Sequence, residues 1–411
     1  MSDSELRILA LVPTARRPGQ VARFSVLDEE LRALGARGVS VYVIATSSGY
    51  ASDVGNVHVR EMPASLWDWS KAALFLIRHL GFVVRLAGWR ELLDAFRQVR
   101  IERFAAELVR RERLALIHSF FAWPGGFGGV LAKRDTGVPL VAGLRGADVN
   151  TMPERNYGGR RNRLFDAAMR AMLGQADATV SVSDFIRRRA IALGADPAAA
   201  RVILKGVHLE MFRIPSDKSA DRAALQVGAD PLILAVAGLV PIKGLRDVLD
   251  ALARVRAGGR RFSFVVCGEG GEKTALEQHA AQLGLADCVV LAGKVSRAEI
   301  GTYFRAADLF VHGALIEASG NVLLEAMASG LPIVCTDAGG PAEYVLDGEC
   351  GFVVPVGDSA AMADRIITLL DDEAMRRRFG QEGRRRAEEF LSYDRMIDEV
   401  IDLYTAVAAR G

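Results

Sequence analysis

Residues 309–337 read LFVHGALIEASGNVLLEAMASGLPIVCTD, and this pattern decides the predicted fold. Its two ends, 309–316 and 331–337, are short apolar runs of the kind that form strands buried on both faces. Between them, 321–330 predicts a short helix that ends at Gly330. Two such strands joined through a helix form a parallel βαβ unit. The stretch therefore predicts a parallel sheet covered by helices.

The same alternation of strand and helix patterns runs along all 411 residues, too many for one ordinary core. It is interrupted at 206–225, which is polar and contains a proline, and a new first strand follows at 231–240. We therefore expect an α/β protein with two doubly wound, Rossmann-like domains. The first spans 1–207, with the terminal helix 390–411 packing back on it, and the second spans 208–389.

The composition argues against several classes of protein. The formal net charge is +2, so the overall charge gives no argument for nucleic-acid binding. No uncharged apolar run reaches the roughly 18 residues needed to cross a bilayer, and the N-terminus lacks a signal-peptide pattern. The cysteines have no metal-ligand spacing, which favours a reducing, cytoplasmic location. They are Cys267, Cys288, Cys335 and Cys350.

One stretch favours contact with a membrane surface. Residues 71–90 contain no acid, and Lys71, Arg78 and Arg85 recur every seven residues, on one face of a helix. This composition is typical of an amphipathic helix that lies on an anionic bilayer. The alternative is a helix that covers the first sheet and lets its arginines reach solvent at the rim. Peripheral contact with the inner face of the cell membrane is therefore a hypothesis.

Two glutamates flank the start of the helix predicted at 321–330. Glu317 follows a strand, and Glu325 lies about one turn into the helix. Open α/β sheets bind ligands at the carboxyl ends of their strands, and a helix N-terminus offers free N–H groups to a diphosphate. Carboxylates accept hydrogen bonds from sugar hydroxyls. The pattern favours a nucleotide-sugar site, whereas each glutamate alone would be read as a surface acid. The amides expected near the phosphates belong to Gly320, Asn321, Val322 and Leu323.

A lysine is expected on the phosphate side of this site. The sequence AGLVPIKG at 237–244 places Lys243 just before a predicted helix, where it can neutralise a diphosphate leaving group. The alternative is an exposed loop lysine. The later CGEGGEK stretch lacks the spacing of a Rossmann dinucleotide motif, because Lys273 stands where the last glycine should be. Redox chemistry is therefore not indicated.

The stretch 317–358 resembles the signature of the retaining glycosyltransferases of family 4, which have the GT-B fold. The E-x7-E motif of that family matches Glu317 and Glu325. The resemblance covers nearly the whole chain and is strongest over 231–360. It implies two Rossmann-like domains facing a central cleft, with the acceptor on the first and the donor on the second.

The resemblance also implies the activity and the roles of residues. A hexosyltransferase-type enzyme of class EC 2.4 would move a sugar from a nucleotide-diphosphate sugar to a hydroxyl of a carbohydrate, lipid-linked or small-molecule acceptor. Cell-envelope, exopolysaccharide or glycolipid biosynthesis is the expected setting. Glu317 and Lys243 would be catalytic, and Glu325 would contact the ribose of the donor. The other donor-binding residues would be Gly320, Asn321, Val322, Leu323, Gly268, Val295 and Gly238.

This chain departs from the family pattern on the phosphate side. Gly238 stands where the family has an arginine, so one of two phosphate cations is missing. Arg145 replaces a histidine and Lys205 replaces an asparagine of the pattern, and either could supply the lost charge. The residues expected on the acceptor or phosphate side are Gly19, His118, Arg145, Asp148 and Lys205.

No divalent metal and no cofactor are expected. The chain contains no D-x-D triplet, and Lys243 with the helix dipole would stabilise the leaving group instead. Two alternatives to a transferase stay open. One is a non-catalytic GT-B partner or activator that binds a nucleotide, and the other is a nucleotide-sugar epimerase or hydrolase on the same architecture.

Overall fold

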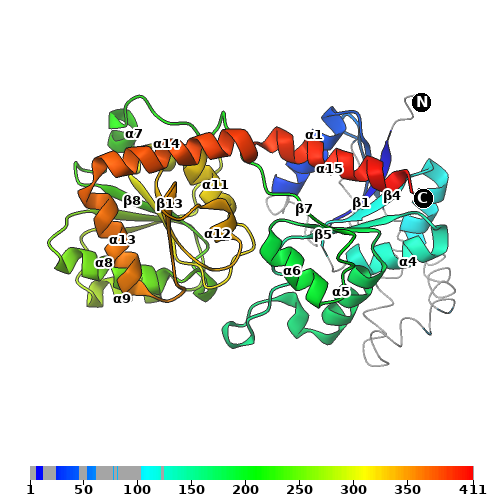
Figure 1. Cartoon of the computed structure of the whole chain (residues 1–411), viewed down its shortest axis with the longest axis horizontal. Coiled ribbons are helices and arrows are strands. Elements are labelled where there is room, and N and C mark those ends of the chain that lie inside the picture. The colour runs from blue at the N-terminus through cyan, green and yellow to red at the C-terminus, as the bar shows by residue number, and fades with distance from the viewer. Residues whose placement is uncertain are drawn as a thin grey trace. The chain divides into compact units, whose positions relative to one another are not determined.

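The computed structural model describes residues 6–12, 25–45, 53–61, 77, 81, 103–121 and 125–410. The chain divides into two compact units, each built on one parallel sheet with helices (Figure 1). The first unit joins Met1–Ile203 to Ile397–Gly411, and the second spans Leu204–Met396. The predicted class, α/β with two doubly wound sheets, is confirmed.

The sheet of the first unit has the order β3-β2-β1-β4-β5-β6-β7 over the described part of the chain. Its strands are all parallel. The central strands are buried along their length, as expected when helices cover both faces of a sheet. The bounds are β1 Arg7–Leu11, β2 Ser40–Ala45, β3 Val57–Glu61, β4 Leu116–Ser119, β5 Leu140–Leu144, β6 Ala178–Ser181 and β7 Ala200–Val202.

The helices of the first unit begin at residues that satisfy free backbone N–H groups. The side chain of Asn162 accepts a hydrogen bond from the N–H of Phe165, and Ser183 caps the next helix in the same way. The described helices are α1 Ser25–Ala36, α4 Phe127–Thr136, α5 Arg163–Gln175 and α6 Asp184–Ala192, with 3-10 turns η3 Pro153–Arg155 and η4 Gly159–Arg161. Helix α15, Tyr393–Ala408, belongs to the first unit from Ile397 onward.

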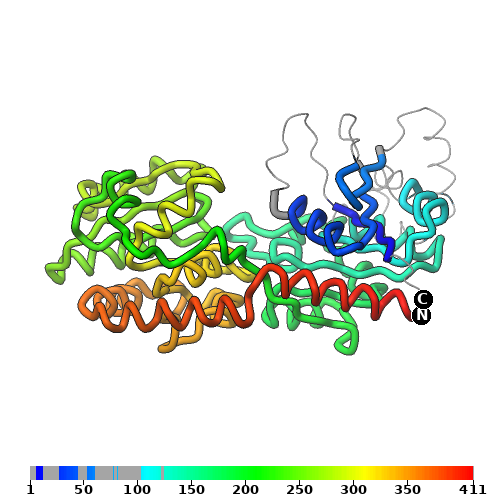
Figure 2. The backbone as a smooth tube through the Cα atoms, turned by 90° about the horizontal axis from the view of Figure 1, so that it is seen from above, coloured from blue at the N-terminus to red at the C-terminus, as the bar shows by residue number. Residues whose placement is uncertain are grey.

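The sheet of the second unit has the order β10-β9-β8-β11-β12-β13, again all parallel. Its strands are β8 Leu232–Val236, β9 Ser263–Cys267, β10 Val289–Gly293, β11 Leu309–His312, β12 Ile333–Thr336 and β13 Gly351–Val354. Its helices are α7 Ser219–Ala224, α8 Leu245–Ala257, α9 Lys273–Gln282, α10 Ile300–Ala306, α11 Asn321–Ala328, α12 Pro341–Tyr344, α13 Ser359–Asp371 and α14 Glu373–Phe390, with the 3-10 turn η5 Pro241–Lys243. Figure 2 shows the chain entering this unit in green and leaving it in red.

The core of the second unit consists of two apolar clusters, and alternate residues of β8 belong to one cluster and to the other. In β8, Ile233 and Ala235 belong to one cluster, whereas Leu232 and Leu234 belong to the other. Successive side chains of a strand point to opposite faces, so the two clusters lie on opposite sides of the sheet. This packing holds β8 and β11 side by side. The loops that leave these two strands therefore start from neighbouring positions.

Candidate active site

The two loops that start at the carboxyl ends of β8 and β11 bring together the residues expected to be catalytic. Strand β8 leads into η5, which ends at Lys243, and β11 leads into the loop that carries Glu317. Chain order reverses between these two neighbouring strands, because β9 follows β8 on one side and β11 lies on the other. Such a switch point is where open α/β sheets bind ligands.

Lys243 and Glu317 form an ion pair. The Nζ of Lys243 lies 2.6 Å from Oε2 of Glu317, and their side chains are 28% and 16% exposed. The other carboxylate oxygen, Oε1, accepts a hydrogen bond of 3.0 Å from the N–H of Ala318. Burial alone would raise the pKa of Glu317, but the charge of Lys243, the neighbouring ring of His312 and the two hydrogen bonds hold this pKa below its usual value. Glu317 is therefore an anion with both oxygens engaged.

Close backbone packing sets the position of Lys243. Gly244, which follows it, has a φ of +59°, and a Cβ added there would lie 1.9 Å from the carbonyl oxygen of Gly313. The N–H of Leu315 donates to the carbonyl oxygen of Ile242, at 2.9 Å. The turn with the lysine thus lies directly against the loop with the glutamate, and only glycine fits at position 244.

The backbone of Glu317 is held by the loop that follows β12. Its N–H donates to the carbonyl oxygen of Ala338, and its own carbonyl accepts from the N–H of Gly340, at 2.9 and 3.0 Å. A Cβ added at Gly340 would lie 1.9 Å from the carbonyl oxygen of Ala318. The carboxylate of Glu317 therefore stands on a backbone that is held by the loop after β12.

The start of α11 offers open backbone donors beside Glu317. Gly320 has a φ of +81° and precedes the helix without a side-chain cap. Among the described residues, the N–H groups of Asn321 and Val322 make no hydrogen bond, whereas that of Leu323 donates to the carbonyl of Gly320, at 2.9 Å. Of the four expected amides, those of Gly320, Asn321 and Val322 thus make no hydrogen bond in the described part of the chain, and that of Leu323 is engaged. Free N–H groups at a helix start suit an anion.

Glu325 lies within α11 and has the opposite electrostatic character to Glu317. Burial raises its pKa to about 7, and the charge of Arg297 lowers it only in part. The described structure gives its side chain no hydrogen bond. A partly buried carboxylate without donors favours its protonated form. It can accept hydrogen bonds from a ligand that supplies donors, such as the two hydroxyls of a ribose.

Three further residues expected near the donor lie around the ends of β8, β9 and β10. Gly268 follows β9, and a Cβ there would lie 1.8 Å from the carbonyl oxygen of Ala237, so the two loops touch through their backbones. Val295 follows β10 and is partly buried. Gly238 has open space: the nearest atom to an added Cβ is the carbonyl oxygen of Glu269, at 3.8 Å. Packing would therefore allow a side chain at position 238.

One residue of this site was not predicted from the sequence. His312 ends β11, is 4% exposed, and places its Nε2 3.7 Å from Oε2 of Glu317. Burial, with a smaller effect of the charge of Lys243, lowers its pKa to about 4, although the charge of Glu317 raises it in part. The signal available in the sequence was a single histidine at the end of an apolar strand, five residues before Glu317.

Three of the residues expected on the acceptor side, His118, Arg145 and Asp148, lie in the first unit, where His118 and Asp148 are buried and Arg145 is partly buried. Arg145 donates through Nη2 to both carboxylate oxygens of Glu30, at 2.9 and 2.8 Å, and lies over the ring of Phe120. Nδ1 of His118 is hydrogen-bonded to the hydroxyl of Tyr404 on α15. The charge of Arg145 is thus already balanced within its own unit.

The remaining predicted residues lie in different parts of the chain, and some of them lie outside the described residues. Asp148 accepts from the N–H groups of Arg145, Gly146 and Val149; burial raises its pKa, although these hydrogen bonds lower it in part. Lys205 is buried and lies in the second unit, where its N–H donates to the hydroxyl of Tyr344. Gly19 lies outside the described residues. So does the stretch 71–90, apart from positions 77 and 81.

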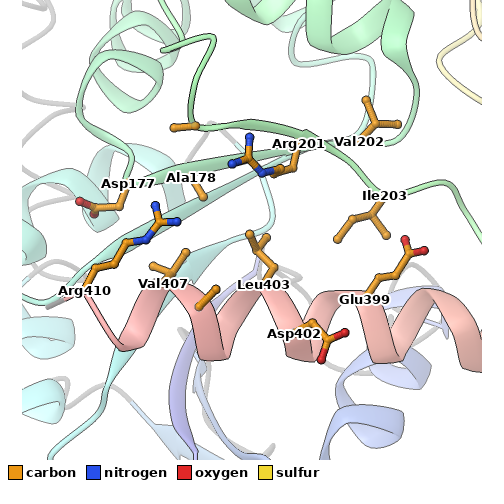
Figure 3. A pocket seen from close by; sticks show the side chains of 12 residues that line it. Asp177, Ala178, Arg201, Val202, Ile203, Glu399, Asp402, Leu403, Val407 and Arg410 are labelled. Atoms are coloured by element: carbon orange, nitrogen blue, oxygen red, sulfur yellow. The ribbon is translucent and has the colours of Figure 1, made fainter.

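A pocket of about 410 Å³ lies in the first unit, and none of the predicted residues lines it. Strands β6 and β7 and helix α15 line it (Figure 3). Asp177 and Arg410 lie toward one end, Glu399 lies toward the other, and Arg201 lies between them. The described residues include no cluster of three or more histidines, cysteines or acids that could hold a metal ion. Nor does any helix among them combine the length and apolar content needed to cross a bilayer.

The sequence matches two protein families. Residues 217–386 match the family described as Glycosyl transferases group 1, and residues 25–211 match Glycosyltransferase Family 4. A D-inositol 3-phosphate glycosyltransferase of Streptomyces scabiei is 30% identical to this chain over 95% of this chain and 92% of its own length.

Two solved structures share the fold. A sucrose-phosphate synthase from Thermosynechococcus elongatus has a TM-score of 0.77 at 19% identity, covering 99% of this chain and 100% of that one. HepE from Anabaena, solved in complex with UDP-glucose, has a TM-score of 0.72 at 22% identity, covering 98% and 100%. These similarities confirm the predicted architecture of two Rossmann-like domains.

Proposed function

This chain belongs to the glycosyltransferases of group 1 and family 4, and we propose that it moves a sugar from a nucleotide-diphosphate sugar with retention of configuration. It is a sugar-transferring enzyme of class EC 2.4. One observation carries the proposal about the donor. Lys243 and Glu317 form a partly buried ion pair at the switch point of the sheet, beside the open amides of α11.

Each part of this arrangement suits one part of a nucleotide sugar. The diphosphate would lie against the open N–H groups of Asn321 and Val322, where the positive end of the helix dipole favours negative charge. Lys243 would stabilise the charge that develops as the diphosphate leaves. Glu317 would accept hydrogen bonds from the transferred sugar, and Glu325 from the ribose. No step of this arrangement needs a divalent metal.

The partners can be narrowed by the names of similar proteins. HepE was solved with UDP-glucose, and the Streptomyces scabiei relative is named for an inositol phosphate acceptor. We therefore propose UDP-sugars as the first donors to test, and hydroxyls of a polyol phosphate, a carbohydrate or a lipid-linked sugar as acceptors. Cell-envelope or glycolipid biosynthesis is the setting that fits these acceptors.

The test measures release of the nucleoside diphosphate from a panel of nucleotide sugars, with and without acceptor and in the presence of EDTA. We expect release that depends on acceptor and is unaffected by EDTA. Lys243→Ala should lose about 3 kcal/mol of transition-state stabilisation, a fall in kcat of roughly 100-fold. The control is Arg377→Ala, which removes an exposed cation on α14.

The same assay separates the alternatives. Release that is equally fast without any acceptor would indicate a hydrolase. Binding of nucleotide without any release would indicate a non-catalytic partner. Wild-type rates in Lys243→Ala would contradict the assignment of the phosphate cation. The anomeric configuration of the product, read by NMR, tests retention directly.

A further inference from the structure

His312 is the last residue of β11, the strand that leads into the loop with Glu317. It is 4% exposed, and its strand is tied to β12 through pairing with Cys335. The hydroxyl of Thr336 donates to the carbonyl of Ala314, at 2.6 Å, which fixes the turn directly after the histidine. The ring is therefore held in place by the sheet and has little freedom to move away from Glu317.

One oxygen of Glu317 faces two nitrogen groups. Oε2 lies 2.6 Å from Nζ of Lys243 and 3.7 Å from Nε2 of His312. The first distance is that of a strong, charge-assisted hydrogen bond, and the second is too long for a hydrogen bond. A shift of roughly 0.8 Å would bring the histidine to the usual distance of about 2.9 Å. Lys243 therefore makes the hydrogen bond to Oε2 of Glu317, and His312 lies just beyond hydrogen-bond distance of the same oxygen.

The surroundings of the ring select one tautomer. Nδ1 of His312 is buried and has no hydrogen-bond partner among the described residues. A proton on Nδ1 would be a buried donor that faces only the backbone of His312 itself, without a well-formed hydrogen bond, which proteins rarely tolerate. A proton on Nε2 points instead toward a carboxylate. Burial keeps the ring neutral, since its pKa is lowered to about 4, so it carries a single N–H, on Nε2.

We propose that His312 is a positioning residue for Glu317, which donates its Nε2–H to Oε2 when Lys243 turns to the diphosphate of the donor. This rests on the proposed function, because a nucleotide sugar is what draws the lysine away. Without the histidine, Glu317 would then be a buried anion held only by the N–H of Ala318. With it, the carboxylate keeps two donors and the same orientation toward the sugar.

The first test does not depend on turnover. Histidine ring signals are recorded by ¹H–¹⁵N NMR in the wild type and in Lys243→Met, which removes the competing ammonium group. The signals of His312 are identified by their absence in His312→Gln. We expect the Nε2–H tautomer in both proteins, with the Nε2 proton shifted downfield in Lys243→Met. An Nδ1–H tautomer, or unchanged ring signals between the two proteins, would overturn the proposal.

The second test separates positioning from support of the fold. His312→Leu keeps a buried side chain and removes the donor, so kcat should fall about tenfold, the usual effect of losing a hydrogen bond to a charged group. The KM for UDP-glucose should change less than twofold, and His312→Gln, which retains an N–H donor, should recover most of the loss. Equal loss in both variants, or a changed KM with an unchanged kcat, would refute the role. If the wild type transfers no sugar at all, the proposed function fails, while the NMR comparison still decides the proposal.

Discussion

Glu317 and Glu325 lie on either side of one helix start, yet their pKa values move in opposite directions. Glu317 has a lysine, a histidine and a backbone donor, and these outweigh its burial. Glu325 is also withdrawn from solvent, but only the charge of Arg297 opposes the effect of burial. Their environments thus separate the two carboxylates into an anion, Glu317, and a group that titrates near neutrality, Glu325.

The raised pKa of Glu325 has a consequence for stability. In the unfolded chain the carboxyl releases its proton near 4.5, whereas the folded protein holds the proton up to about 7. Folding therefore takes up a proton between these values, so this group lowers stability as pH rises through the window. Glu325→Gln, which is neutral at every pH, should unfold at a higher temperature than the wild type at pH 8. At pH 8 we expect the free energy of unfolding to rise by an amount on the order of 2 kcal/mol, a figure reduced because the side chain is partly exposed. This gain should disappear near pH 4.5.

Thermal unfolding of both proteins at pH 4.5 and pH 8 checks this prediction. The matched control is Glu349→Gln, which neutralises an exposed glutamate of the same unit. A stabilisation by Glu325→Gln that is equal at both pH values would show that the carboxyl is charged in the folded protein at pH 4.5 and above, contrary to the effect of burial.

The helix and the strand next to Glu317 could be predicted from the local sequence pattern. The pattern at 321–330 predicted a helix, and the structure has α11 at Asn321–Ala328 with Gly330 in the left-handed region after it. The strand predicted at 309–316 is shorter, because β11 ends at His312. After that residue the backbone turns away to bond the carbonyl of Ile242. That contact is long-range, and hydrophobic periodicity carries no information about it.

The contact between Lys243 and Glu317 could not be predicted from hydrophobic periodicity, because it too is long-range. Lys243 and Glu317 are 74 positions apart, and they meet because β8 and β11 are neighbours in the sheet. The residue pattern predicted that both belong to one site, the resemblance to a family implied that both are catalytic, and neither gave a role to His312. The sequence offers Arg145 as a phosphate cation, but local sequence carries no information about its partner Glu30, which lies 115 positions away.

The glycines at the loop contacts permit a prediction at the level of these elements. Gly244→Ala would place a Cβ 1.9 Å from a backbone oxygen at a φ of +59°, which forces the turn carrying Lys243 off the loop carrying Glu317. We expect a loss of about 2–4 kcal/mol of stability. Gly238→Ala is the matched control in the same loop, since its Cβ has open space and should change stability by less than about 0.5 kcal/mol. Urea unfolding of the two variants measures both values, and similar losses in the two would contradict the packing argument.

At the scale of the whole molecule, the chain consists of two units that share one helix. The first residues of α15 belong to the second unit, and the helix belongs to the first unit from Ile397 onward. Each unit contains a fully buried tyrosine whose hydroxyl makes a long-range hydrogen bond. Tyr404 bonds the ring of His118 in the first unit, and Tyr344 accepts from the N–H of Lys205 in the second, at 3.1 Å. These two bonds offer a means of perturbing each unit by itself.

The last prediction compares Tyr404→Phe with Tyr344→Phe. Each change removes one buried hydroxyl and leaves a polar partner without it, at a cost of about 1–3 kcal/mol. If each unit is its own cooperative block, Tyr404→Phe should speed hydrogen exchange of the β4 amides and leave those of β11 unchanged, and Tyr344→Phe should do the reverse. Hydrogen exchange read by mass spectrometry resolves the two strands, and the two variants serve as controls for each other. Equal acceleration of both strands in both variants would mean that α15 couples the units into a single unfolding transition.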